Sequence, residues 1–233
     1  MQNFDIVKKS EVDNTFRVAS IRGTYDLQMQ NIEERFTGEL HLPDEWRIGL
    51  IVGNSGTGKT TIAKHLFKDD YIVGFDYKAK SVVDDMPKNC SVAEITQAFS
   101  AVGFASVPSW LKPYAVLSNG EKMRVDLARA MLEKRELFVF DEFTSVVDRN
   151  VAKIGSFAMQ KAIRKNNGGG NFVAISCHYD VEDWLMPDWV FDTNTMEFRV
   201  CVKKKDLNAK LNCTKSHQTR NQSIGRCLLD ITI

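Results

Sequence analysis

WRIGLIV-GNSGTGKT, residues 46–60, decides the fold of this chain of 233 residues. The first seven residues are almost wholly apolar, as in a strand that is covered on both faces of a parallel sheet. The glycines of the next eight let the backbone turn so that successive N–H groups face one centre, which suits a phosphate. A helix expected over residues 59–68 adds the positive end of its dipole. This strand–loop–helix order predicts a site for a nucleoside triphosphate.

The polar groups of this loop have expected roles at the triphosphate. Lys59 reaches the β- and γ-phosphates, and the Thr60 hydroxyl completes a Mg²⁺ shell. The loop therefore predicts ATP or GTP together with Mg²⁺. The residues expected to bind the nucleotide are Gly53, Asn54, Ser55, Gly56, Thr57, Gly58, Lys59, Thr60 and Thr61.

A second informative sequence, LFVFDE at residues 137–142, ends in two acids and supplies the groups that nucleotide hydrolysis needs beside the phosphate loop. Four apolar residues predict a buried strand, and Asp141 at its end is placed to hold Mg²⁺ through water. Glu142 is placed to orient and polarise the attacking water. On its own the pair would be an ordinary strand end, but the P-loop upstream favours the catalytic interpretation. His178 follows another expected strand, residues 172–176, where it can donate to the γ-phosphate or hold that water.

Strands alternate with helices along the chain, which predicts an α/β fold with right-handed crossovers. The expected fold is a P-loop NTPase with a mostly parallel central sheet, an N-terminal antiparallel β portion and a short helical subdomain. Residues 172–176 read as the last clear core strand. The expected strands are 16–21, 36–42, 46–52, 137–140 and 172–176, and the expected helices are 59–68, 91–99, 121–134 and 151–165. Residues 166–170, NNGGG, are expected to stop the last helix.

Composition is that of an ordinary globular protein, with 43% hydrophobic residues, 26% charged residues and a net charge of +1. No apolar stretch reaches the length of a membrane span and no signal peptide is evident. Five scattered cysteines favour a reduced, cytoplasmic compartment over disulfides or a zinc site. Eight Lys or Arg against one acid in residues 199–226 leave two interpretations of the end of the chain, a solvated tail or a patch that contacts nucleic acid.

LSNGE at residues 117–121 opens an expected helix, and here the chain resembles the ATP-binding cassette (ABC) ATPases over residues 15–195. The helix continues with Arg124, Asp126, Leu127, Ala128, Arg129 and Ala130. In that family the signature lies across a dimer interface from the P-loop. The resemblance implies that Ser118 and the Gly120 N–H contact the γ-phosphate held by the partner's Lys59. A serine at a helix N-terminus suits an anion, although a simple helix cap remains the alternative.

Three further sites follow from the resemblance. Residues 145–148 are similar to the loop that couples the two sites of a dimer, and Tyr25 is the candidate for stacking on adenine, with Phe16 and Phe36 as rivals. Family members usually carry a Mg²⁺-binding Gln before the signature. Here that interval holds only Gln97, inside an expected helix, so Asp84 is the expected substitute.

The expected function is that of an ATPase that converts ATP and water to ADP and phosphate through closure of a homodimer. Residues 1–200 form the ATPase domain, with a helical subdomain at about 85–135, and 201–233 form the basic tail. The chain resembles short cassette ATPases of phage and mobile-element origin, which favours a soluble protein that is not bound to a transporter and has an unknown protein partner. The alternatives are the nucleotide-binding subunit of a membrane transporter, docked through residues 85–115, and an ATP-dependent switch on nucleic acid.

Overall fold

A computed structural model describes residues 2–10, 15–26, 32–165 and 170–201 of the chain. The chain divides into two compact units, Met1–Arg199 and Val200–Ile233. Only the first two residues of the second unit are described. The basic tail, and most of the glycine-rich stop at 166–170, therefore lie outside the described residues.

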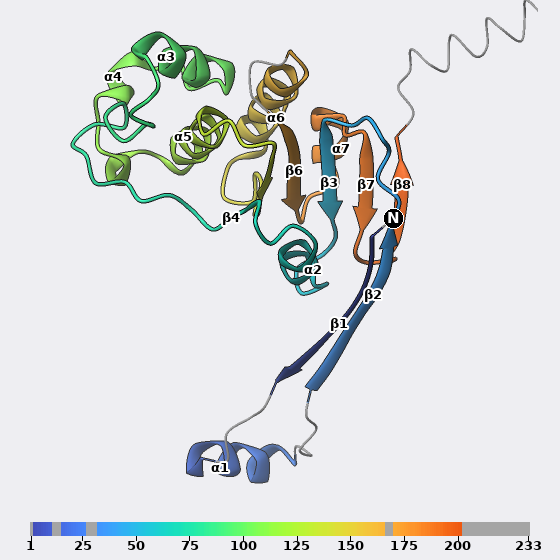
Figure 1. Cartoon of the computed structure of the whole chain (residues 1–233). Helices are drawn as coiled ribbons and strands as arrows, with labels where there is room; N and C mark the ends of the chain where they lie inside the picture. Colours follow the sequence, from blue (N-terminus) through green and yellow to red (C-terminus); the bar gives the residue numbers. More distant parts are fainter. Residues whose placement is uncertain (1, 11–14, 27–31, 166–169, 202–233) are drawn as a thin grey trace, which may run out of the picture. The chain divides into compact units, whose positions relative to one another are not determined.

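The centre of the first unit is a six-stranded sheet in the order β4-β5-β6-β3-β7-β8 (Figure 1). Strand β3 pairs in parallel with β6 on one side and β7 on the other, and all five of its residues are buried. Strand β5 pairs in parallel with both β4 and β6. The prediction of a mostly parallel sheet is confirmed. The strands are β3 (Ile48–Val52), β4 (Tyr71–Ile72), β5 (Leu137–Phe140), β6 (Asn171–Ser176), β7 (Trp189–Asp192) and β8 (Glu197–Val200).

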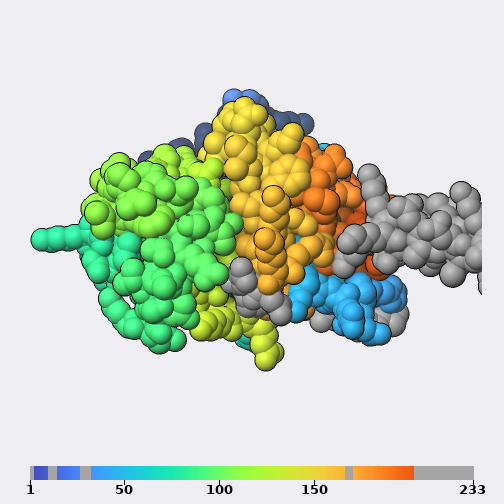
Figure 2. All heavy atoms as spheres, turned by 90° about the horizontal axis from the view of Figure 1, so that it is seen from above, coloured from blue at the N-terminus to red at the C-terminus, as the bar shows by residue number. Residues whose placement is uncertain are grey.

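Helices connect these strands close to the predicted positions. Helices α3 and α5 start at capping boxes on Ser91 and Ser118. Each serine hydroxyl accepts from the backbone N–H of the glutamate three residues later, and that glutamate's carboxylate accepts from the serine N–H. Helix α3 packs on α5 and α6, and Figure 2 shows this region, in green, as a continuous block beside α6, in yellow. The helices are α2 (Lys59–Leu66), α3 (Val92–Ala101), α4 (Val107–Trp110), α5 (Asn119–Leu132), α6 (Arg149–Arg164) and α7 (Val181–Leu185), with a 3₁₀ turn η1 (Tyr114–Val116).

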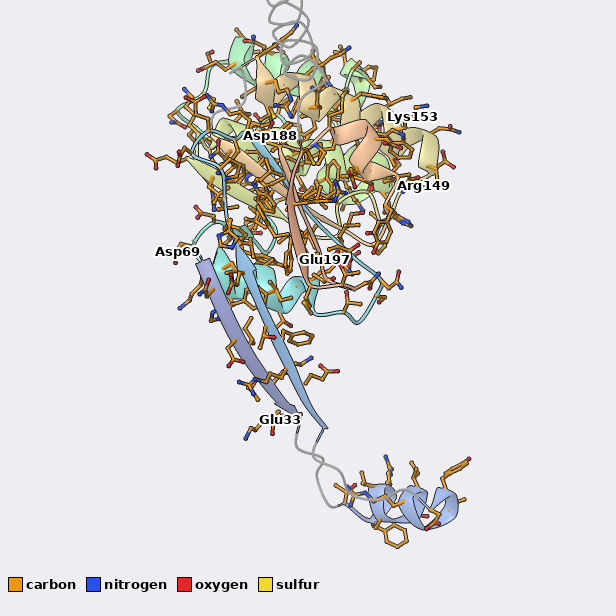
Figure 3. All side chains as sticks on the ribbon, turned by 90° about the vertical axis from the view of Figure 1, so that its right-hand side faces the viewer. Glu33, Asp69, Arg149, Lys153, Asp188 and Glu197 are labelled. Carbon is orange, nitrogen blue, oxygen red and sulfur yellow. The ribbon has the colours of Figure 1, made fainter. Side chains whose placement is uncertain are left out.

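The N-terminal β portion is a two-stranded antiparallel ribbon of β1 (Gln2–Ser10) and β2 (Ile32–Leu40). Phe4, Phe36 and Leu40 bury the base of the ribbon in the core that β3 and α2 share. Glu33 lies toward the other end of the ribbon (Figure 3). The predicted antiparallel portion is confirmed, although β1 was not among the expected strands.

Two sequence predictions about strands are wrong. Residues 16–21 alternate in polarity, yet they lie in a helix, α1 (Phe16–Tyr25), which the Thr15 hydroxyl caps by accepting from the Val18 N–H. None of its residues is buried, so the alternation has no sheet face to match, and a helix satisfies its hydrogen bonds locally. Residues 172–176 are also not the last core strand, because β7 buries Trp189, Val190 and Phe191. Strand β7 has only four residues and follows a proline, so its run is too short to show the alternating pattern of a strand.

Candidate functional site

The phosphate loop connects the end of β3 to the start of α2, as predicted. Gly56 and Gly58 have φ angles of +85° and +86°, which side chains rarely tolerate. A Cβ at Gly58 would also meet the Phe36 ring at 2.5 Å. Phe36 is 8% exposed and lies against the loop at Gly58, so its place in the core explains its aromatic character.

Inside the loop the polar groups bond to one another. The Lys59 ammonium, on a buried side chain, donates to the Asn54 carbonyl at 2.6 Å. The Thr57 hydroxyl donates to the same carbonyl at 2.9 Å. Ser55 is exposed at the tip, and Thr61 is half-buried in the first turn of α2. A lysine so placed has only to leave one carbonyl to reach a phosphate.

The turn after β7 fastens the loop from the other side. The Asn54 N–H donates to the Asn194 side-chain oxygen at 3.1 Å, and the Thr57 and Thr193 hydroxyls lie 2.6 Å apart. The Thr193 N–H donates to the Val52 carbonyl at 2.8 Å. Sequence reasoning missed both residues of this turn because it missed β7, although Asp-Thr-Asn after three apolar residues is a turn signal.

Thr60 and Asp141, both predicted to bind Mg²⁺, come together at the ends of α2 and β5. The Thr60 hydroxyl donates to Asp141 Oδ2 at 2.7 Å. The backbone N–H of Glu142 donates to the other carboxylate oxygen at 2.8 Å. This geometry fits a divalent cation, because a hydroxyl and a carboxylate oxygen meet beside the phosphate loop and oxygen is the ligand that Mg²⁺ prefers.

Tyr71 is a residue of this corner that the sequence did not reveal. Its hydroxyl donates to Asp141 Oδ2 at 2.5 Å, beside the bond from Thr60. Burial, the hydrogen bond to Asp141 and the charges of Asp141 and Glu142 all raise the pKa of Tyr71. The available signal was the short apolar run after α2, which sequence reasoning left unassigned.

Glu142 and His178 follow neighbouring parallel strands, β5 and β6. Glu142 has a φ of +52°, and the next residue, Phe143, is fully buried with its N–H bonded to the Ile175 carbonyl at 2.8 Å. The His178 N–H donates to the Ser176 hydroxyl at 3.1 Å. Left-handed backbone at a non-glycine residue is uncommon and clusters at functional sites. Both residues thus leave the same edge of the sheet.

A pocket of about 370 Å³ opens beside the two acids. Its lining residues are Lys64, Tyr71, Ile72, Val73, Gly74, Phe75, Asp126, Phe140, Asp141 and Glu142. The predicted metal ligand Asp84 is not among them. Asp84 is exposed in a turn, where it accepts from the Ser81 hydroxyl at 2.5 Å. The segment that lines the pocket beside Asp141 is residues 71–75.

A second aspartate of the pocket, Asp126, accepts hydrogen bonds from two tyrosines. Tyr77 and Tyr114 stack at 3.9 Å between ring centroids, and their hydroxyls donate to the two oxygens of Asp126 at 2.7 and 2.8 Å. Burial raises the pKa of Asp126, against the hydrogen bonds from both tyrosines and the charges of Arg129 and Lys122. This cluster joins three segments, those before α3, before α5 and within α5.

The signature residues lie at the start of α5. Ser118 is exposed and accepts from the Glu121 N–H at 3.4 Å, so it is a helix cap whether or not it binds a phosphate. A Cβ at Gly120 would meet Val151 at 3.1 Å. Tyr25 is 70% exposed at the end of α1, and no described hydrogen bond or ring contact joins it to the phosphate loop. Asp148, in the predicted coupling loop, caps α6.

Comparison with known proteins finds one matching family model and several distant relatives. The model of the NB-ARC domain matches residues 29–162, more than half of the chain. The energy-coupling factor transporter ATP-binding protein EcfA of Malacoplasma penetrans is 22% identical over 79% of this chain and 76% of its own length. The aliphatic sulfonates import ATP-binding protein SsuB 3 of Pseudomonas syringae pv. syringae is 28% identical, over 62% of this chain and 61% of its own length.

Solved structures agree on the fold. A dimeric ATP-binding cassette in a post-hydrolysis state bound to ADP and Pi superposes with a TM-score of 0.54 at 12% identity, over 71% of this chain and 89% of that one. In the part of the chain that the structure describes, no helix has the length and apolarity that crossing a membrane requires. The chain belongs to the NB-ARC domain family, and it is similar in sequence to ABC-type ATP-binding proteins and in fold to a solved ATP-binding cassette.

Proposed function

We propose that the chain hydrolyses ATP at two composite sites that form when two copies close on each other. The hydrogen bond from Thr60 to Asp141 carries this proposal, because it joins the phosphate loop to the acidic strand end where a cation would bind. Thr60 and Asp141 would hold Mg²⁺, which neutralises phosphate charge when bound. Lys59 binds the β- and γ-phosphates, and Glu142 accepts a proton from the attacking water.

His178 and the signature complete each site from two sides. His178 follows the strand next to that of Glu142 and donates to the γ-phosphate. The N–H groups of Asn119 and Gly120 lie in the first turn of α5, where no earlier carbonyl of the helix accepts them. A γ-phosphate held by a second copy would supply that acceptor. Tyr25 is proposed to stack on adenine.

The test separates binding from turnover. Glu142→Gln should keep ATP affinity, lose at least about a hundredfold in turnover, and form a dimer with ATP and Mg²⁺ that light scattering detects. Lys59→Ala in the same background should remain a monomer because it binds no ATP. A Glu142→Gln protein that stays monomeric at saturating ATP would exclude closure around the nucleotide.

Complementation tests the composite site directly. In the Glu142→Gln background, Lys59→Ala and Ser118→Arg should each abolish dimerisation alone. Mixing them leaves one intact site, Lys59 of one subunit with Ser118 of the other, so dimers should return. Ser91→Arg is the matched control, because Ser91 makes the same capping box at α3 and should not affect dimerisation. If the mixture stays monomeric, the two residues do not share a site across subunits.

A second candidate function is the ATP-binding subunit of a membrane transporter. The names of EcfA and SsuB 3 favour it, and so do three exposed apolar residues around α3 and α4: Val92 (68% exposed), Val107 (54%) and Leu111 (69%). Under this proposal a tagged chain co-purifies with a multi-span membrane protein, and Leu111→Asp releases it. Ile154→Asp, at another exposed apolar position, on α6 (59%), is the control and should not release it.

A further inference from the structure

The carboxylate of Asp141 is held by three donors from three directions. Thr60 and Tyr71 both donate to Oδ2, at 2.7 and 2.5 Å. The Glu142 N–H donates to Oδ1 at 2.8 Å. Since both oxygens are engaged, rotation of the carboxylate would break at least one of these bonds. Its orientation is thus set before any cation arrives.

Tyr71 differs from the other two donors because it belongs neither to the phosphate loop and its helix nor to the strand end that carries Asp141. It lies in β4, which pairs in parallel with β5 through Tyr71–Val139 and Ile72–Phe140. The Lys64 ammonium lies 5.0 Å from the centre of the Tyr71 ring. Sheet pairing fixes the backbone, and the ring contacts Lys64 of α2. The hydroxyl is therefore anchored independently of the nucleotide.

This independence matters when Thr60 becomes a cation ligand. The Thr60 hydroxyl must then share its oxygen with the cation, so its bond to Asp141 is subject to change. Partners that orient a metal ligand commonly contribute 10- to 100-fold in metal affinity, on the order of 1–3 kcal/mol. Tyr71 is the donor on Oδ2 that does not have to change in this exchange, beside the Glu142 N–H on Oδ1.

We propose that Tyr71 is a positioning residue for the divalent cation, because its hydroxyl holds the Asp141 carboxylate toward the cation bound with ATP. The proposal rests on the assignment of Asp141 as a Mg²⁺ ligand in the proposed function. Tyr71 touches neither cation nor nucleotide in this role. Its removal should raise the Mg²⁺ requirement and leave the metal-free affinity for the nucleotide unchanged.

The experiment uses the full chain and a fluorescent ATP analogue, with affinity measured across a Mg²⁺ series and in EDTA. Tyr71→Phe should need about tenfold more Mg²⁺ for half of the full affinity gain, with affinity in EDTA within about twofold of wild type. Tyr114→Phe is the matched control, because it removes a tyrosine hydroxyl from another aspartate, Asp126. The proposal is overturned if Tyr71→Phe and Tyr114→Phe have the same Mg²⁺ requirement.

Asp141→Asn separates this inference from the proposed function. If Asp141→Asn leaves the Mg²⁺ dependence intact, the assignment of Asp141 fails and the role of Tyr71 fails with it. If it abolishes most of that dependence, Tyr71→Phe should add nothing in the Asp141→Asn background, because its effect acts through Asp141. A further tenfold effect there, or a parallel loss of affinity in EDTA, would show a general structural defect and overturn the proposal.

Discussion

Two aspartates of the same pocket, Asp126 and Asp141, are each held by hydroxyl groups but differ in what the hydroxyl groups connect. Asp126 receives one tyrosine on each oxygen, and the stacked rings of Tyr77 and Tyr114 cover it. Asp141 receives Thr60 and Tyr71 on a single oxygen at the open end of a strand. The first arrangement joins the segments before α3 and before α5 to α5 itself. The second places a carboxylate beside the phosphate loop. We propose that similar hydrogen bonds serve stability in one place and ligand binding in the other.

Exchanging each carboxylate for an amide should separate the two aspartates by the largest effect, on ATP turnover. Asp141→Asn removes the negative charge that a cation needs, so ATP turnover should fall by at least about a hundredfold. Asp126→Asn should lower turnover less than about tenfold, because Asp126 contacts no expected ligand. Phosphate release at saturating ATP and Mg²⁺ measures both. Equal losses in the two variants would mean that Asp126 is part of the chemistry.

Stability should respond in the opposite order. Asp126→Ala leaves two half-buried tyrosine hydroxyls without their acceptor, which should lower the free energy of unfolding by about 2 kcal/mol. Urea unfolding followed by circular dichroism measures this change. Asp44→Ala, at an exposed aspartate, is the control and should stay within about 0.5 kcal/mol of wild type. A cost for Asp126→Ala no larger than that of the control would exclude a stabilising role.

Sequence alone predicts the Asp141 corner better than the Asp126 cluster, for a physical reason. The apolar run before Asp141 and the glycines before Thr60 are local patterns, and parallel strands bring their carboxyl ends to one edge. The expected strand 137–140 and the start of α2 at Lys59 therefore match the structure.

The residues that sequence reasoning missed depend on long-range contacts. Tyr71 meets Asp141 across 70 positions, and Tyr77 meets Asp126 across 49. Nothing in the spacing of a tyrosine and an aspartate announces such a pair. The error over residues 16–21 has a related cause, because six alternating residues form a strand only where a partner strand exists. Strand β4 was not among the expected strands because a run of two residues is too short to recognise.

Removing one hydroxyl from the Asp126 cluster tests how much a single hydrogen bond contributes to stability there. Tyr77→Phe keeps the stacked ring and loses one of the two bonds to Asp126, so it should cost about 1 kcal/mol of unfolding free energy. In the Asp126→Ala background the same change should cost much less, because the acceptor is already gone. Additive costs in that double-mutant cycle would place the role of Tyr77 in its ring and not in its hydroxyl.

The smallest expected effect is the pH dependence of the Asp126 contribution. Burial raises the pKa of Asp126 in the folded chain above the ordinary value of 3.8. As the pH rises from 3.8 through this raised pKa, the unfolded chain releases the proton first, so ionisation favours unfolding. The stabilisation from Asp126 is then complete below pH 3.8, declines as the pH rises toward the folded pKa, and is lost above it. Wild type should exceed Asp126→Asn in unfolding free energy by more at about pH 4 than at about pH 7. Other groups titrate equally in both proteins, so only Asp126 should make the difference in unfolding free energy depend on pH. If that difference grows with pH, the tyrosines and Arg129 lower the pKa of Asp126 by more than burial raises it. Asp126 would then be held as a charged carboxylate in the folded chain.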